Sequence, residues 1–152
     1  MLQELHEKKR FRRMRESSWD RTGANMDEVT VPPGATHELP QLEGPGIVRH
    51  LWLTSVGTTA DFHRELEMAI CFDGESPSQV ELPVADFFLF GHGELVDVDA
   101  APIQVSRQPH VTAAPYRGSL NCFFPMPFAR SASFRFRNRG EGTVTLYYHV
   151  DW

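Results

Sequence analysis

A segment near the start of the chain combines the side-chain types that carbohydrate-binding sites use. Residues 17–25 read S-S-W-D-R-T-G-A-N and contain Trp19, Asp20, Arg21 and Asn25. An indole ring packs against the C–H groups of a sugar, while carboxylate, guanidinium and amide groups bind hydroxyls with fixed geometry. These residues therefore predict a sugar-binding segment. The alternative is a connector between two elements, in which Asp20 and Arg21 form a local ion pair.

A second candidate is His92, which lies between Gly91 and Gly93. Glycine permits positive φ and close approach of the backbone, so we expect a tight loop that presents the imidazole. In a sugar site this side chain would assist a leaving oxygen or donate a hydrogen bond. The alternative is a corner of a sheet without a binding role.

Two short stretches are dense in phenylalanine. The second of them contains Pro125 and Pro127, which favour an extended sheet edge. Such aromatic density predicts a subunit interface or the wall of a ligand site, and the alternative is burial in the core. The candidate interface residues are Phe87, Phe88, Phe90, Phe123, Phe124 and Phe128.

The sequence lacks the common catalytic templates. It contains no nucleophile elbow of the form G-x-S-x-G, no phosphate loop and no dinucleotide fingerprint. The seven histidines form neither H-x-H nor H-E-x-x-H, and Cys71 and Cys122 lack metal-site spacing. We expect Glu65 and Glu67 to lie on the same face of a strand, about 6.5–7 Å apart. Exposed glutamates on a strand usually contact solvent, so this spacing does not identify a catalytic pair. We therefore expect neither a metal nor a cofactor, and the catalytic residues stay unknown.

The elements that must position these residues are short strands. From residue 17 onward, apolar and polar residues alternate with period two, for example over 47–53, 66–72 and 144–150. The turn signal Asp73-Gly74 predicts a hairpin, and residues 94–119 resemble a long connection between sheets. This pattern favours an all-β fold, an antiparallel β-sandwich of jelly-roll type in a single domain over 17–152.

The first sixteen residues have a different composition. Six of the fifteen lysines and arginines lie there, and neither glycine nor proline interrupts the segment. Leu2, Leu5, Phe11 and Met14 recur at roughly helical spacing. We therefore predict a short basic N-terminal helix over 1–16 that docks on an acidic neighbouring surface, with nucleic-acid or lipid binding as the weaker alternative.

The composition is that of an ordinary globular chain. The protein has 152 residues, of which 41% are hydrophobic and 23% charged, and a formal net charge of −5. The acidic balance does not favour nucleic-acid binding. No apolar run approaches the ~18 residues of a membrane helix, and no secretory signal is evident. We therefore expect a cytoplasmic protein without nucleic-acid or membrane partners.

Four stretches, taken in order, resemble one known family. After S-S-W-D-R-T-G-A-N come L-E-G-P-G-I-V-R-H-L-W, then F-D-G-E-S-P-S-Q-V-E-L-P-V-A-D-F-F-L-F-G-H-G, then L-N-C-F-F-P-M-P-F-A-R-S-A, with Y-Y-H-V-D-W at the end. Together they look like the first jelly roll of the domain-of-unknown-function 2961 family, which is associated with glycoside hydrolase family 172. The resemblance covers nearly all of the chain from Ser17 to Trp152.

The resemblance implies hydrolysis of fructofuranosyl or arabinofuranosyl linkages by two glutamates, as in difructose-dianhydride hydrolases, and assembly into trimers or hexamers. Family members carry two tandem jelly rolls with the glutamate pair in the second, so neither glutamate is placed here. Ala24 stands where many members have a second glycine. The expectation is a furanosidase component that supplies a sugar-binding rim. Its partner is a carbohydrate, with further copies or a chain bearing the second jelly roll. The alternative is a structural, self-assembling jelly roll.

Overall fold

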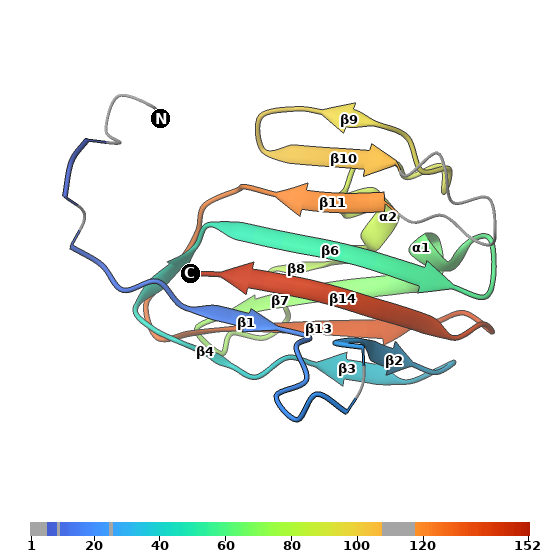
Figure 1. The fold of residues 1–152 in the computed structure, drawn as a ribbon, viewed down its shortest axis with the longest axis horizontal. Helices are drawn as coiled ribbons and strands as arrows, with labels where there is room; N and C mark the ends of the chain where they lie inside the picture. Colours follow the sequence, from blue (N-terminus) through green and yellow to red (C-terminus); the bar gives the residue numbers. More distant parts are fainter. Residues whose placement is uncertain (1–5, 9, 25, 108–117) are drawn as a thin grey trace.

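The computed structural model describes residues 6–8, 10–24, 26–107 and 118–152. They form two antiparallel sheets packed face to face, which confirms the predicted β-sandwich (Figure 1). The seven-stranded sheet lies in front in Figure 1 and has the order β1-β14-β6-β11-β10-β9, with β2 also paired to β14. Its strands are β1 (Arg15–Ser17), β2 (Val29–Val31), β6 (His50–Gly57), β9 (Val98–Asp99), β10 (Ile103–Arg107), β11 (Gly118–Cys122) and β14 (Val144–Asp151).

The second sheet has five strands in the order β3-β13-β7-β8, with β4 also paired to β13. A separate two-stranded ribbon joins β5 to β12. The bounds of these strands are β3 (Thr36–Glu38), β4 (Leu42–Glu43), β5 (Gly46–Val48), β7 (Leu66–Phe72), β8 (Val80–Pro83), β12 (Met126–Phe128) and β13 (Ser131–Asn138).

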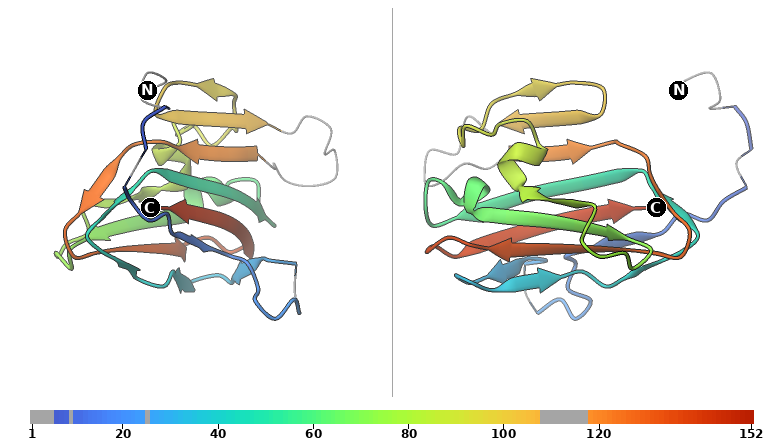
Figure 2. Two further views of the ribbon diagram at one scale, coloured as in Figure 1. Left: turned by 60° about the vertical axis from the view of Figure 1, so that its left-hand side comes forward. Right: turned by 180° about the vertical axis from the view of Figure 1, so that it is seen from behind.

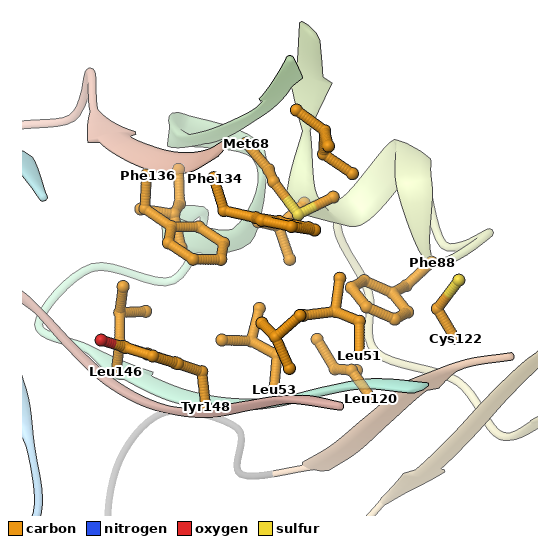
Figure 3. Packing of buried hydrophobic residues seen from close by; sticks show 14 of the residues in the cluster. Leu51, Leu53, Met68, Phe88, Leu120, Cys122, Phe134, Phe136, Leu146 and Tyr148 are labelled. Carbon is orange, nitrogen blue, oxygen red and sulfur yellow. The ribbon is translucent and has the colours of Figure 1, made fainter. Parts of the chain in front are cut away.

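The core lies between the two sheets because alternate residues of the long strands point inward. In β6, β13 and β14 every second residue is buried, as period-two alternation requires. Figure 3 shows Met68, Phe134 and Phe136 of one sheet facing the apolar side chains of the other. The apolar side chains they face include Leu51, Leu53, Leu120, Leu146 and Tyr148.

The strand face predicted to be buried along 66–72 is correct, although Ala69 on the opposite face is buried too, and the prediction along 47–53 is wrong. Leu66, Met68 and Ile70 are buried, as expected. Val48 and Leu51 are both buried, whereas strict alternation would place their side chains on different faces of one strand. The two strands β5 and β6 are separated at Arg49, whose N–H donates to the carbonyl of Asp151 at 2.8 Å. This interruption reverses the alternation, so two segments of opposite register read as one in the sequence.

The predicted N-terminal helix is wrong for the residues that the structure describes. Residues 10–14 have no regular structure, and Arg15–Ser17 forms β1, which pairs with β14. Met14 and Trp152 exchange two backbone hydrogen bonds of 2.7 and 3.1 Å. Phe11 is 61% exposed, so a helix here would bury no apolar face, and short helices without such burial are marginal in water.

Two four-residue helices, α1 (Phe62–Glu65) and α2 (Val84–Phe87), interrupt the strands where no helix was predicted. Asp73-Gly74 does follow β7, and β7 pairs with β8 across a connection of residues 73–79. Both Asp73 and Gly74 have positive φ, 58° and 72°. The predicted connection over 94–119 contains β9 and β10, which pair with each other; residues 108–117 lie outside the described part.

Candidate functional site

The segment around Trp19 is an exposed loop that its own aspartate holds in shape. Trp19 is 62% exposed. The carboxylate of Asp20 accepts hydrogen bonds from the N–H groups of Thr22 and Ala24, both at 2.9 Å, and from the Thr22 hydroxyl at 2.8 Å. Asp20 therefore braces the loop, whereas we expected it to hold sugar hydroxyls. Trp19 and Arg21 are both exposed in this segment.

The structure does not bring His92 to this loop. His92 is exposed and follows α2, while the Trp19 loop connects β1 to β2. Figures 1 and 2 place the two segments at different edges of the sandwich. One ligand of ordinary size would not contact both, so the predicted rim is not assembled as a single site. Asn25, the remaining residue of that prediction, lies outside the described residues.

Three of the six phenylalanines expected at an interface lie in the core of the chain itself. Phe88, Phe90 and Phe128 are buried because α2 and the β5–β12 ribbon fold over the ends of the sandwich. Phe87 is partly buried against the same core. Phe123 and Phe124 remain exposed and are the candidates that a partner could still reach.

The two outward faces of the sandwich differ in their chemistry. On the five-stranded sheet, Arg135 pairs with Glu81 at 3.0 Å and Arg139 pairs with Glu67 at 2.7 Å, as on a solvated surface. The outward positions of β6, β11 and β14 carry aromatic, imidazole, amide and hydroxyl groups, together with the carboxylate of Asp151. We call this set the outer face; it consists of His50, Trp52, Ser119, Asn121, His149 and Asp151, all partly buried.

His50 is held from three sides on the outer face. Its Nδ1 lies 3.4 Å from Oδ2 of Asp151, and its Nε2 lies 3.0 Å from Oδ1 of Asn121. The ring of Phe123 stacks on the imidazole at 4.8 Å between centroids, with planes only 4° apart. These contacts fix both the position and the plane of the ring.

Trp52 is fixed in a similar way. Its indole Nε1–H donates to Oγ of Ser119 at 2.8 Å, and Nδ2 of Asn121 donates to the same oxygen at 3.0 Å. The ring of His149 lies 4.8 Å from that of Trp52. The outer face therefore presents an immobilised indole beside an imidazole, an amide and a hydroxyl, which together are the groups that sugars require.

Charge on the outer face is concentrated at one end. Arg15 of β1 binds Asp151 through two hydrogen bonds, of 2.6 and 2.9 Å. Burial raises the pKa of Asp151, but the hydrogen bonds and charges of Arg15 and His50 outweigh it, so the pKa is lowered overall. Burial lowers the pKa of His149, and the charges of Arg15 and His50 lower it further against the opposing effect of Asp151.

The Trp19 loop borders the outer face. Ser17 at the end of β1 pairs with His149, and the N–H of Ser18 donates to the carbonyl of Tyr148. At the far end of the loop, Glu28 accepts a hydrogen bond of 2.8 Å from the hydroxyl of Tyr147. The exposed indole of Trp19 is thus carried on a loop that begins and ends beside β14.

The remaining candidates serve structural purposes. Glu67 pairs with Arg139, and Glu65 accepts a hydrogen bond of 3.0 Å from Thr59, so neither is a free acid. A hollow of about 110 Å³ between Glu38, Cys71 and Arg135 on the five-stranded sheet is smaller than typical ligand pockets. Among the described residues, no group of three or more histidines, cysteines and carboxylates is placed to hold a metal ion.

Sequence reasoning did not select His50, Trp52 and His149 as candidate site residues. Each occupies a polar or aromatic position in an alternating strand, which was the available signal. What the sequence does not reveal is that β6 lies between β11 and β14, which brings Asn121 and Asp151 to either side of His50.

The model of the family described as GH172 domain-like matches residues 21–149. The matched region covers most of the chain, from the Trp19 loop to β14. A search of curated proteins finds no match. No helix in the described part of the chain has the length and apolar character to span a membrane.

Proposed function

Because the chain belongs to the GH172 domain-like family, we propose that it is the carbohydrate-binding component of a glycoside hydrolase. The ligand in this proposal is a furanoside, either fructofuranosyl or arabinofuranosyl, as the family resemblance implies. The catalytic glutamates are assigned to a second jelly roll and not to this chain. Within the described residues, the glutamates that we considered as a pair, Glu65 and Glu67, are already engaged by neighbouring side chains.

The observation that carries the proposal is the arrangement around Trp52. Its indole is held by Ser119 and lies beside the ring of His149, at 4.8 Å. A fixed indole offers a flat apolar surface for the C–H face of a sugar without loss of side-chain freedom on binding. Asn121 and Ser119, next to it, supply groups that bind hydroxyl and ring oxygens. Trp19, exposed on the adjoining loop, is available as a second platform.

The test is calorimetry with fructo- and arabino-oligosaccharides. Trp52→Ala is expected to weaken binding about two- to tenfold, which is the range for losing one aromatic contact. Trp19→Ala is expected to weaken it less, because its ring is exposed on a loop and does not lie on the outer face. Arg137→Ala, an exposed change on the opposite sheet, is the matched control and should bind as the parent does.

Two outcomes would contradict the proposal. One is absence of measurable affinity for either class of oligosaccharide in the parent chain. The other is a Trp52→Ala variant that folds, as judged by circular dichroism, and binds with unchanged affinity. A result in which Trp19→Ala abolishes binding while Trp52→Ala does not would move the site from the outer face to the loop.

A second function, assembly with further copies or with a partner chain, is favoured by one exposed apolar region. Ile47 of β5 pairs with Pro127 of β12, and both Ile47 and Phe124 are exposed. Phe124 is 49% exposed, which is costly for a phenylalanine in water. In this alternative, these side chains are covered either by further copies in a trimer or hexamer or by a chain with a second jelly roll.

A further inference from the structure

Opposite edges of the seven-stranded sheet carry opposite charge. The strand order ends at β1 on one side and at β9 on the other (Figure 1). Residues 10–14, which we call the basic arm, precede β1 and include three arginines but no carboxylate. Residues 94–99, which we call the acidic edge, include β9 and carry three carboxylates but neither lysine nor arginine. Each copy of the chain therefore offers a basic segment and an acidic segment at opposite edges of one sheet.

The basic arm leaves the body of the sandwich. Its last residue, Met14, exchanges two backbone hydrogen bonds with Trp152, and the preceding residues run outward (Figures 1 and 2). Arg12 is exposed and forms no ion pair within the described part of the chain. Phe11 is also exposed, with the guanidinium of Arg13 5.7 Å from the centroid of its ring. The arm thus holds cationic groups and an aromatic ring where another molecule can reach them.

The acidic edge is held in a fixed shape. Leu95 is buried, and it packs so closely on Gly118 of β11 that a Cβ there would lie 2.6 Å from its side chain. The carboxylate of Asp97 accepts a hydrogen bond of 2.8 Å from the N–H of Arg107 and another from the guanidinium of the same residue. Between these two anchors Val96 is 40% exposed. The edge therefore presents an aliphatic side chain in a preformed position among carboxylates.

The outer side of β9 is free to accept a strand. β9 pairs with β10 through Val98 and Asp99, and no other described strand pairs with it. An unpaired edge offers backbone N–H and C=O groups to an added strand. Glu94 and Asp99 are exposed beside it and form no ion pair within the described residues. Such an edge favours an extended segment with positive charge and disfavours an acidic one.

We propose that the basic arm of one copy binds along the acidic edge of a second copy as an added strand. In this arrangement the arginines of the arm face the carboxylates of the edge, and Phe11 covers Val96. The sequence predicted that this segment docks as a helix; the extended form keeps the charges and changes the mode of binding to strand addition. The inference specifies the contact in the self-assembly considered above, and it does not depend on carbohydrate binding.

A second copy is required because the arm cannot reach the acidic edge of its own chain. Five spacings between adjacent strands separate β1 from β9, which amounts to about 24 Å. The five residues of the arm span at most about 18 Å when fully extended. The partner must also be acidic, and beyond its first sixteen residues the chain carries seventeen aspartates and glutamates against nine lysines and arginines. Another copy supplies that charge on a matching edge.

The base of the arm lies beside apolar side chains already considered for assembly. Met14 pairs with Trp152, and a Cβ on Gly46 of β5 would lie 3.1 Å from Cδ1 of that indole. The exposed Ile47 follows Gly46 directly. A copy bound by the arm would therefore approach this apolar region as well. Because two different surfaces meet, each copy can bind one neighbour through its arm and another through its edge, and repetition closes into a ring when the rotation allows it.

The first experiment compares the association of charge-reversed chains by light scattering at low salt. Arm reversal is Arg12→Glu with Arg13→Glu, and edge reversal is Glu94→Lys with Asp99→Lys. Either reversal alone is expected to weaken association about tenfold or more, because like charges then face each other. A chain that carries both reversals has opposite charges again and should associate as the parent does. Salt at about 1 M should weaken association of the parent, since it screens exposed charges.

The matched control is Arg137→Glu with Glu141→Lys, at exposed positions outside both segments. It should associate as the parent does. If the parent associates and the single reversals have no effect, the inference is overturned, and self-assembly through Ile47 and Phe124 stands. If folded single reversals are weakened but the chain with both does not recover, the pairing of arm with edge is overturned. A monomeric parent overturns the inference and self-assembly together, and leaves the carbohydrate proposal standing.

The second experiment locates the contact by cross-linking between copies. Chains with Phe11→Cys and chains with Val96→Cys, both in a Cys71→Ser background because Cys71 is only partly buried, are mixed and treated with a short bis-maleimide. Linked dimers that contain one chain of each kind, identified by mass spectrometry, are expected. A mixture of Phe11→Cys with Glu141→Cys is the control and should give few. Equal yields from the two mixtures would overturn the inference.

Discussion

At the residue scale, His63 is a buried imidazole with a strongly lowered pKa. It lies on α1 and is 2% exposed, with Nε2 3.1 Å from the hydroxyl of the buried Ser55. The rings of Phe62 and Phe90 lie 3.9 and 5.2 Å away. Burial lowers the pKa of His63 to about 4, since an imidazolium in this site would lose its hydration.

This burial predicts a loss of stability in acid. The pKa of His63 is lower in the folded chain, about 4, than in the unfolded chain, 6.5. Its contribution is therefore complete above pH 6.5, and falls as pH decreases to about 4, where both states are protonated. The free energy of unfolding should drop by roughly 3 kcal/mol over that interval. Chemical denaturation at a series of pH values measures this.

His63→Leu is the variant that isolates the effect. It removes the titration but keeps an apolar side chain, so the drop between pH 6.5 and 4 should become smaller. Burial also lowers the pKa of His37, so part of the acid sensitivity should remain in the variant. His92→Leu, at an exposed position, serves as the control. An equal drop in the parent and His63→Leu would show that another group is responsible.

Residue types suggested a kind of chemistry, but they did not indicate where in the fold the polar and aromatic side chains would gather. Trp19 is an exposed aromatic, as its neighbours suggested, but Asp20 is used within its own loop. Short polar side chains bind the nearest backbone N–H groups when a turn brings them close. The sequence alone looks the same whether such a side chain braces its own loop or binds a ligand. His50 and Trp52 were overlooked because their partners come from strands about 70 and 100 residues away.

At the scale of elements, the end of β6 has space for glycine alone at position 57, where α1 packs closely against it. A Cβ added to Gly57 would lie 2.2 Å from Cγ of Phe62, which is fully buried. Gly57→Ala should therefore displace α1 and destabilise the chain by about 1–3 kcal/mol, as overpacking of a core does. The midpoint of thermal unfolding measures this change.

The control for Gly57→Ala is Val56→Ala at the neighbouring, outward position of β6. The account expects the glycine variant to lose more stability although it adds a single methyl group. If Gly57→Ala unfolds at the temperature of the parent, then α1 is not packed against β6 as the structure has it.

Strands were easier to predict than helices for a physical reason. Period-two alternation is a direct consequence of burying one face of a sheet, so β7 and β14 could be recognised from sequence. The four residues of α1 and of α2 make barely one turn, which is too short for a helical period to appear. At the N-terminus, pairing of β1 with β14 prevailed over a weak helical pattern because it satisfies backbone groups of both strands.

At the scale of the whole molecule, the exposed Phe124 and Ile47 predict association. Light scattering should give the mass of a trimer or hexamer for the parent chain, because self-association would remove these apolar side chains from water. Phe124→Asp should reduce the mass toward that of the monomer. A parent chain that is monomeric at high concentration would contradict self-association. Assembly with a different partner chain would then be the part of this proposal still to be tested.

At the scale of the whole molecule, the two outward faces of the sandwich also differ in the chemistry of their side chains. One sheet carries ion pairs such as Arg135–Glu81, and the other combines the Arg15–Asp151 pair with rings, an amide and a hydroxyl. Composition could not reveal this difference, because it arises only when β6, β11 and β14 lie side by side. The account of function depends on this asymmetry and on the family to which residues 21–149 belong.

The most direct measurement is a map of backbone amide resonances during titration with fructo- and arabino-oligosaccharides. The account predicts that saturable shifts gather on β6, β11 and the end of β14, around Trp52, Asn121 and His149. Strands β7 and β13 of the opposite sheet should not respond. Shifts gathered on the opposite sheet, or none at saturating sugar, would contradict carbohydrate binding at the outer face.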